Sequence, residues 1–403
     1  MREQIIMYLK IHPRVILKLW LIARHLMKMW SYFVPVQNKT ILFNSFGGRA
    51  VNDSPKAIYD EICQRSEFRD WKLIWALVNP EQVEIPRGEK IKIDTPAFFK
   101  ALLYSRVWIG NSGTDRDISL KLKRNLRVET WHGTPLKKIC GDEHTETFAI
   151  KPDDYKGPID NETIRCAQSQ YDRQLFKRLF HCTEDSILLS DLPRNDEILN
   201  ISEERIARVK STLGIPQEKK VILYTPTYRE YLLNEDNKTY VAPPINFNKW
   251  KSVLGEKYVL LIRAHYAVTA SLNLIEDDFV KDVSKYCSVN ELYAVADMMI
   301  SDYSSTYFDY SILNRPMFCF AYDRIEYEKK RGLYVVLDQF LPCRIDYNEE
   351  SLLDSILNVD IEYASEQTKK FQMKYAPYAG NATKMVVDEI VKRLDINKNN
   401  SLK

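Results

Sequence analysis

The segment ADMMISDYSSTYFDYSILNRPMFCFAY (296–322) carries the pattern that decides the fold. Its apolar run DMMIS (297–301) predicts a short buried strand, and MFCFAY (317–322) predicts a second one. The residues between the two runs have helical spacing, which is typical of the crossover that joins parallel strands. The segment therefore predicts a β–α–β unit with Ser304 and Ser305 at the start of its helix. Hydroxyl and amide groups at a helix start favour a phosphate, although an ordinary N-cap has the same sequence.

The same alternation of apolar runs and helical patterns extends along the chain. The other runs that we expect to form strands are TILFNSF (40–46), KLIWALV (72–78), VWIGN (107–111), RVET (127–130), IRCAQS (164–169), VILYTP (221–226) and YVLLIR (258–263). A charged helix pattern follows LPRNDEIL (192–199) and ends at Gly214 before a fresh strand, which indicates a domain boundary. We expect two Rossmann-like α/β domains, residues 38–200 and residues 201–403 including the C-terminal helix. A ligand would then lie in the cleft between them.

The composition excludes several classes of protein. The 403 residues include 58 Lys and Arg against 55 Asp and Glu, and this small net charge of +3 argues against a nucleic-acid partner. The seven cysteines are scattered, without a C-x-x-C pair, which is typical of a reduced cytosolic chain with no structural metal. The sequence contains neither a P-loop nor a G-x-G-x-x-G motif, so ATPase and dehydrogenase functions are not indicated.

The N-terminal segment, residues 1–37, is apolar but interrupted by cations. Five of these break it before a span of ~20 uncharged residues can form, so it does not predict a transmembrane helix. They are Lys10, Arg14, Lys18, Arg24 and Lys28. On a helix they share one side with His25, and apolar residues occupy the remainder. We expect an amphipathic helix that lies on an anionic cytoplasmic membrane surface; an ordinary surface helix packed on the domain is the alternative.

A histidine follows one of the predicted strands in the first half. His132 lies in ETWHGTPLKKI (129–139), where we expect Thr134 and Pro135 to begin a helix and to leave the imidazole exposed on the preceding turn. An imidazole in that position could take a proton from a hydroxyl or stabilise a developing phosphate charge. A hydrogen-bonded structural histidine is the alternative.

Polar side chains also follow two strands of the second half. Arg263 and His265 end the apolar segment LLIRAHY (260–266), and their spacing of two places both on one face of the strand. Together they suit a diphosphate, although Arg263 could instead pair with a carboxylate. The segment YTPTYRE (224–230) adds hydroxyls and Arg229 at another strand end. Several strands therefore converge on groups that favour an anion.

These segments together resemble the CDP-glycerol glycerophosphotransferase family, which polymerises or primes teichoic-acid chains on the inner face of bacterial membranes. The resemblance extends from residue 45 to residue 334. Its segments, in family order, are SFGGRAVNDSPKAIY, TWHGTPLKK, LPRND, VILYTPTYR, RAHY, NELYAVADMMISDYSSTYFDYSILNRPMFCF and AYDRIEYEKKRGLY.

The resemblance implies a GT-B fold, with CDP-glycerol in the C-terminal half, a lipid-linked acceptor at the N-terminal half, and no required metal or cofactor. The implied catalytic residues are His132, as the base on the acceptor hydroxyl, and His265. The implied donor-binding residues are Arg263, His265, Thr225, Thr227, Arg229, Asp302, Ser304, Ser305 and Asp309. Asp302 and Asp309 could instead be capping or structural residues.

The implied reaction is attack by an acceptor hydroxyl on the distal phosphorus of CDP-glycerol, with release of CMP, at the cytoplasmic face of the cell membrane. Three alternatives remain open at this point. The donor could be CDP-ribitol, or the chain could be a GT-B glycosyltransferase that uses a nucleotide sugar. It could also be a non-catalytic, membrane-bound module that binds a nucleotide or a polymer.

Overall fold

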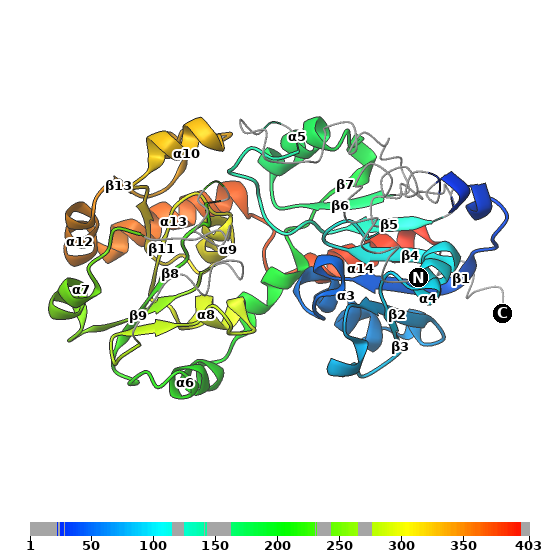
Figure 1. Ribbon diagram of the computed structural model, residues 1–403, viewed down its shortest axis with the longest axis horizontal. Helices are drawn as coiled ribbons and strands as arrows, with labels where there is room; N and C mark the ends of the chain where they lie inside the picture. The colour runs from blue at the N-terminus through cyan, green and yellow to red at the C-terminus, as the bar shows by residue number, and fades with distance from the viewer. Residues whose placement is uncertain are drawn as a thin grey trace, which may run out of the picture.

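The computed structural model shows two α/β units side by side, each with helices packed around a parallel sheet (Figure 1). The residues that the structure describes are 22, 25–27, 29–114, 125–140, 142, 163–229, 231, 243–264 and 276–395. Across this described part, no helix combines the length and apolar character that a membrane span requires.

The first unit contains a seven-stranded sheet in the order β3-β2-β1-β4-β5-β6-β7, in which all neighbours are parallel. The strands are β1 (Gln37–Asn44), β2 (Lys72–Leu77), β3 (Glu89–Lys92), β4 (Ser105–Gly110), β5 (Leu126–Glu129), β6 (Thr163–Ala167) and β7 (Ile187–Leu189). The helices are α3 (Asp53–Gln64), α4 (Pro96–Tyr104) and α5 (Gln170–Leu179). Short 3₁₀ segments are η1 (Phe46–Gly48), η2 (Ser66–Phe68), η3 (Pro80–Gln82), η5 (Glu184–Ser186) and η6 (Pro193–Asn200).

The second unit contains a six-stranded parallel sheet in the order β10-β9-β8-β11-β12-β13. The strands are β8 (Lys220–Tyr224), β9 (Tyr258–Ile262), β10 (Val280–Asp282), β11 (Met298–Ser301), β12 (Met317–Phe320) and β13 (Ile345–Asp346). The helices that follow η6 are α6 (Glu203–Thr212), α7 (Phe247–Leu254), α8 (Val289–Val295), α9 (Thr306–Ser311), α10 (Arg324–Lys330), α11 (Leu337–Phe340), α12 (Glu349–Leu357), α13 (Ile361–Tyr375) and α14 (Ala382–Arg393). The predicted β–α–β unit at 296–322 is therefore β11-α9-β12.

Each apolar run named above forms a strand, but the sequence prediction missed β3, β7, β10 and β13. These four strands are the outermost strands of the two sheets. An edge strand has a neighbour on only one side and is often short, so it does not need a continuous apolar run. β13, for example, has only two residues. The prediction therefore found the interior of each sheet and missed its edges.

The C-terminal helix α14 packs on the first unit, which corrects the assignment of all residues after 200 to the second domain. Its buried Val386, Val387 and Ile390 share one apolar core with Ile58 and Ile62 of α3. The preceding helix α13 still packs in the second unit, where its Phe371 belongs to another core. The chain thus crosses back between α13 and α14, as the orange and red ribbons show (Figure 1). The apolar face of α14 fits either sheet by its sequence, so only tertiary packing decides its place.

Strand register brings the predicted site segments together. In the first sheet Asn44 pairs with Gly110, and Gly110 pairs with Glu129. In the second sheet Tyr224 pairs with both Ile262 and Ile300. Because parallel strands end at one edge of their sheet, the loops that follow β1, β4 and β5 are neighbours, and so are the loops that follow β8, β9 and β11.

Candidate functional site

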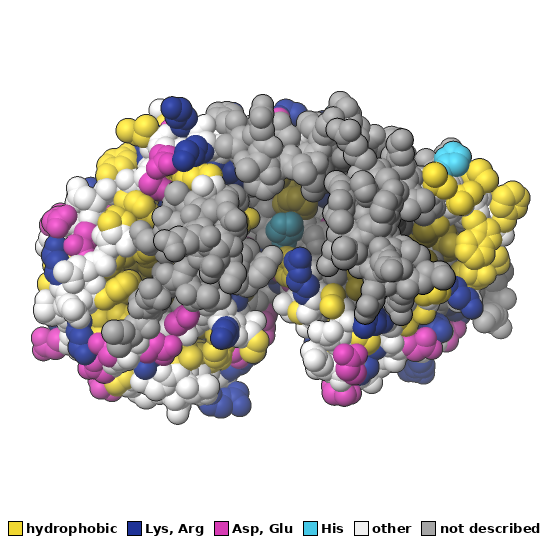
Figure 2. Space-filling view, viewed as in Figure 1, with side chains coloured by type: hydrophobic (Ala, Val, Ile, Leu, Met, Phe, Trp, Pro, Cys, Tyr) yellow, Lys and Arg dark blue, Asp and Glu magenta, His cyan; other side chains and the backbone are white. Residues whose placement is uncertain are grey.

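Two adjoining cavities lie between the units, in the hollow visible near the middle of Figure 2. The first has a volume of about 440 Å³ and the second about 780 Å³. Both are lined by residues of the two units. The residues that line both are His132, Arg263, Val289, Ser305 and Thr306. The cleft expected from two α/β domains is therefore present, and His132 lies where its two parts meet.

The imidazole of His132 is held in one tautomer. Its Nδ1 lies 2.9 Å from the carbonyl oxygen of Asn111. A carbonyl oxygen can only accept, so Nδ1 carries the proton and the neutral ring keeps a lone pair on Nε2. The ring also packs 4.3 Å from the Trp131 ring and 5.9 Å from the Phe46 ring. Burial lowers the pKa of His132 below its ordinary value, although the Asn111 hydrogen bond raises it. The ring is therefore neutral near pH 7 and can accept a proton.

The chain bends at His132 and Gly133, and the described residues 134–140 do not form the expected helix. Thr134 is therefore not an N-cap, which corrects the prediction. Its hydroxyl lies 2.9 Å from Gln168 Oε1 and 2.9 Å from Asp172 Oδ2, both buried. The Thr134 hydroxyl is thus satisfied by distant residues of the first unit and not by an amide at a helix start. The local sequence could not reveal them.

Gly133 is one point at which the two units touch beside His132. Its φ is +146°, and a Cβ at this position would lie 2.5 Å from Ser305 Oγ. We expect Gly133→Ala to force the walls of the cleft apart and to lower the free energy of unfolding by about 1–3 kcal/mol. Chemical denaturation measures the change.

The matched control for this prediction is Gly214→Ala. Gly214 also has a positive φ, +62°, but the nearest atom to its Cβ would be Lys281 Nζ at 3.7 Å. The control therefore introduces backbone strain without a contact between the units. Equal destabilisation by the two variants would contradict the proposed role of the close approach at Gly133.

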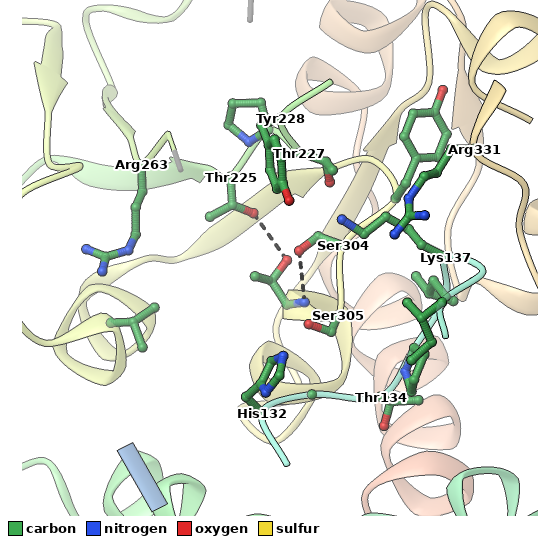
Figure 3. A pocket seen from close by; sticks show the side chains of 18 of the residues that line it. His132, Thr134, Lys137, Thr225, Thr227, Tyr228, Arg263, Ser304, Ser305 and Arg331 are labelled. Atoms are coloured by element: carbon green, nitrogen blue, oxygen red, sulfur yellow. Dashed lines mark hydrogen bonds between the residues drawn. The ribbon is translucent and has the colours of Figure 1, made fainter. Parts of the chain in front are cut away.

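Hydroxyl groups of the second unit form the wall opposite His132 (Figure 3). Thr225 Oγ1 lies 3.0 Å from Ser301 Oγ and 3.3 Å from Thr306 Oγ1, and Ser304 Oγ accepts from the Thr306 amide at 3.3 Å. Ser305 lines both cavities and its side chain makes no capping hydrogen bond. Thr225, Ser304 and Ser305 therefore lie together as the sequence predicted. Thr227 lines the same cavity, and its buried hydroxyl has no hydrogen-bond partner among the described residues.

Arg263 reaches both cavities from the end of β9. Its Nη1 donates to the carbonyl oxygens of Val283 and Tyr286, at 3.2 and 2.7 Å. Burial lowers the pKa of Arg263 from its ordinary value, which still leaves the group charged at neutral pH. Backbone carbonyls thus hold one edge of the guanidinium. The expected partner of Arg263, His265, lies outside the described residues.

Arg229 and Asp302 do not line either cavity, which corrects their assignment as donor-binding residues. Both are fully buried. Arg229 donates to Asp302 at 2.9 Å and to both carboxylate oxygens of Asp323, at 2.7 and 2.9 Å. Asp302 in turn accepts from the amide of Thr227 at 3.0 Å. The pair therefore holds the loop after β8 from behind the wall of the cavity.

Asp309 lies at the back of the second cavity, and its carboxylate is already engaged. Oδ2 accepts from Arg194 at 2.8 Å, and Oδ1 accepts from Asn195 at 2.9 Å. Burial raises the pKa of Asp309 and Arg194 opposes this rise. The aspartate thus joins α9 to η6, in the LPRND segment between the sheets.

Three cleft residues escaped the sequence prediction although their segments were noticed. Lys137 and Arg331 line the first cavity with Tyr228, and Lys137 Nζ lies 5.2 Å from the centre of the Tyr228 ring. Figure 3 shows Lys137 and Arg331 on the side of the cavity opposite Arg263. In the sequence, Lys137 and Arg331 are basic residues of the segments TPLKK and KKRGLY. Lysine and arginine are common on protein surfaces, so their presence in a segment does not show whether they face a cavity or solvent. Within the described ranges, no group of three or more His, Cys, Asp or Glu side chains is arranged to hold a metal ion.

Comparison with known proteins gives a consistent result. The sequence profile of the family described as CDP-Glycerol:Poly(glycerophosphate) glycerophosphotransferase matches residues 26–392. A teichoic acid glycerol-phosphate transferase of Staphylococcus aureus is 32% identical over 372 residues, which cover 88% of this chain and 94% of that protein. A teichoic acid poly(glycerol phosphate) polymerase of Staphylococcus epidermidis is 34% identical over 81% of this chain, which spans 46% of the polymerase.

A solved structure is also similar over nearly its whole length. It is a histidine variant of the wall teichoic acid polymerase TagF soaked with CDPG, and it is 30% identical with a TM-score of 0.82. The match covers 99% of this chain and 99% of that one.

Proposed function

Because the chain belongs to the CDP-Glycerol:Poly(glycerophosphate) glycerophosphotransferase family, we propose that it is a transferase with a GT-B fold that uses CDP-glycerol. It moves glycerol phosphate to a hydroxyl group of a membrane lipid-linked acceptor, in the synthesis of teichoic acid or a related envelope polymer. The observation that carries this proposal is His132. Its neutral ring has a defined acceptor nitrogen and lies between two cavities, one of them lined with hydroxyl and cationic groups.

In the proposed reaction the acceptor oxygen forms a bond to the distal phosphorus of CDP-glycerol, and the bond from that phosphorus to the oxygen of CMP breaks. Nε2 of His132 takes the proton from the acceptor hydroxyl, and CMP leaves with the bonding electron pair. Phosphoryl transfer needs mainly alignment and stabilisation of negative charge. Arg263, Lys137 and Arg331 bring positive charge to the cavity, and Ser304 and Ser305 bring donors. We propose that these groups, rather than a metal, stabilise the charge.

The test is CMP release by the purified protein with CDP-glycerol and a lipid-linked glycerol-phosphate acceptor. We expect release with CDP-glycerol at least about tenfold faster than with CDP-ribitol, because a pocket that hydrogen-bonds one polyol leaves polar groups unpaired with another. We also expect EDTA to leave the rate unchanged. Faster CMP release from CDP-ribitol would show that ribitol phosphate, not glycerol phosphate, is the transferred unit. UDP release from a nucleotide sugar would show that a sugar is transferred. Donor binding without any release would contradict an enzymatic function.

We also propose that the protein binds the cytoplasmic face of the membrane through its N-terminal segment. Residues 1–21 lie outside the described residues, but the end of this segment supports the proposal. Large apolar side chains are exposed there, including Trp30 at 62% and Phe33 at 83%. Hydrophobic side chains gather on this end of the first unit (Figure 2). Aromatic rings with this exposure suit the headgroup region of a bilayer.

We expect Trp30→Ser with Phe33→Ser to weaken binding to phosphatidylglycerol vesicles at least roughly tenfold, since inserting one such side chain contributes about 1.5–3 kcal/mol. Vesicle co-sedimentation measures the change. Tyr363→Ser is the matched control, because Tyr363 is 65% exposed on α13 of the second unit. Equal binding by the double variant and the wild type would exclude this surface as the membrane contact.

A further inference from the structure

The guanidinium of Arg194 joins the two units directly beneath His132. Nη1 lies 2.7 Å from Asp53 Oδ2 in the first unit, and Nη2 lies 2.8 Å from Asp309 Oδ2 in the second. Nη2 also donates to the backbone carbonyl of His132 at 3.1 Å. All three charged side chains are nearly buried, with exposed fractions of 11, 8 and 5%. Arg194 therefore contacts both sides of the cleft and the backbone of the proposed base.

Asp53 leads from the same arginine to the ring of His132. Its Oδ1 accepts from the side chain of Asn111 at 3.0 Å, and the backbone carbonyl of Asn111 receives Nδ1 of His132. The carboxylate of Asp53 thus fixes Asn111, whose carbonyl oxygen sets the tautomer of His132. Asp53 has a φ of +59°, an uncommon conformation for a non-glycine residue, and its carboxylate also accepts from the amide of Ser54 at 2.7 Å. A residue in this constrained conformation whose carboxylate binds both Arg194 and Asn111 is consistent with a functional role.

We propose that Arg194 and Asp53 are positioning residues for His132: they orient the base from behind and hold it against the wall of the second unit. This inference rests on the proposed function, since it assigns His132 the role of the base. Neither residue was among the expected site residues. Asp309 completes the bridge, so the position of the base depends on contact between the units.

The two positioning residues shift the pKa of His132 in opposite directions. The charged groups that face the ring are Asp53 from α3, Arg194 from η6 and Glu129 from β5. Asp53 and Glu129 raise the pKa of His132, and Arg194 lowers it. Arg194→Gln should therefore raise this pKa, and Asp53→Asn should lower it. Because the base must be neutral to accept a proton, the acidic limb of the pH–rate profile should move to higher pH in the first variant and to lower pH in the second.

The experiment measures the titration of His132 directly, by NMR of protein labelled with ¹⁵N-histidine, beside the pH dependence of CMP release. The signal is assigned by its loss in His132→Asn. For Arg194→Gln we also expect kcat to fall roughly 10–10²-fold, as for a base displaced by about 1 Å, with a much smaller change in KM for CDP-glycerol. Arg194→Lys keeps the charge but cannot bridge two carboxylates, so it should restore the pKa of His132 without restoring kcat.

Arg205→Gln is the matched control. Arg205 lines the second cavity and pairs with Glu197 and Glu291, but it does not contact the loop of His132. This variant should leave the pKa of His132 unchanged. If the pKa of His132 shifts in the same direction in Arg194→Gln and Asp53→Asn, or shifts in neither, the proposal is wrong. If Arg194→Gln does not fold, Asp53→Asn still tests it. A wild-type protein that releases no CMP would instead contradict the proposed function, and the NMR titration would still decide the role of the bridge.

Discussion

Replacing His132 with alanine is expected to slow CMP release by ~10²–10⁴, the contribution of a positioned acid–base group. Binding of CDP-glycerol should be retained, because hydroxyl groups and cations of other loops line the cavity. Steady-state CMP release measures the first effect and titration calorimetry with CDP-glycerol measures the second. Loss of turnover with retained binding would separate proton transfer from donor recognition.

The matched control for His132→Ala is His181→Asn. His181 is exposed and lies outside both cavities, and asparagine tolerates its φ of +51°. This variant should keep the wild-type rate. Unchanged turnover in His132→Ala would remove the histidine from the proposed mechanism.

The pH dependence gives a second test of His132. Burial lowers the pKa of the ring from its ordinary value of 6.5. A base works only when neutral, so activity should be lost as the pH falls through this lowered pKa. The acidic limb of the pH–rate profile should therefore lie below pH 6.5. A limb above that value would contradict this expectation, because it would show that the Asn111 hydrogen bond and the carboxylates of Asp53 and Glu129 outweigh burial.

Replacing Arg229 with glutamine is expected to lower the free energy of unfolding by about 3–5 kcal/mol, because it leaves buried carboxylates uncompensated. The guanidinium has no exposed surface and pairs with Asp302, which is also fully buried, and with Asp323. Three aromatic rings surround it, those of Tyr303, Tyr322 and Tyr327, with centres at 5.0, 5.4 and 5.0 Å. Chemical denaturation of the variant and the wild type measures the loss.

Lys39→Ala provides the control for Arg229→Gln. Lys39 pairs with Asp70 on the surface, where both side chains are largely exposed. An exposed pair contributes about 0–1 kcal/mol, so this variant should unfold close to the wild type. A loss below about 1 kcal/mol in Arg229→Gln would mean that water or a rearranged loop replaces the arginine, and that Asp302 does not depend on it.

The contrast between Arg229 and Arg194 shows the limit of prediction at the site. Arg229 follows a strand and sits in the hydroxyl-rich segment YTPTYR, so its sequence position favoured the cleft. Its side chain turns inward because Asp302 and Asp323, distant in the chain, lie behind the loop. Arg194 was noticed only as part of LPRND, yet it lines the second cavity and bridges both units. An arginine has the same local signal in both roles, and its partners decide which role it has.

The sequence by itself determined the interior strands of both sheets, the two-unit α/β architecture and the convergence of Thr225, Arg263, Ser304 and Ser305 near His132. The physical reason is that buried parallel strands require apolar runs, and side chains at their carboxyl ends must meet at one edge. Tertiary structure alone decided the edge strands, the crossing of α14 to the first unit and the ion bridge through Arg194. These features depend on contacts between residues far apart in the chain, and the local sequence around one residue does not predict its distant partner.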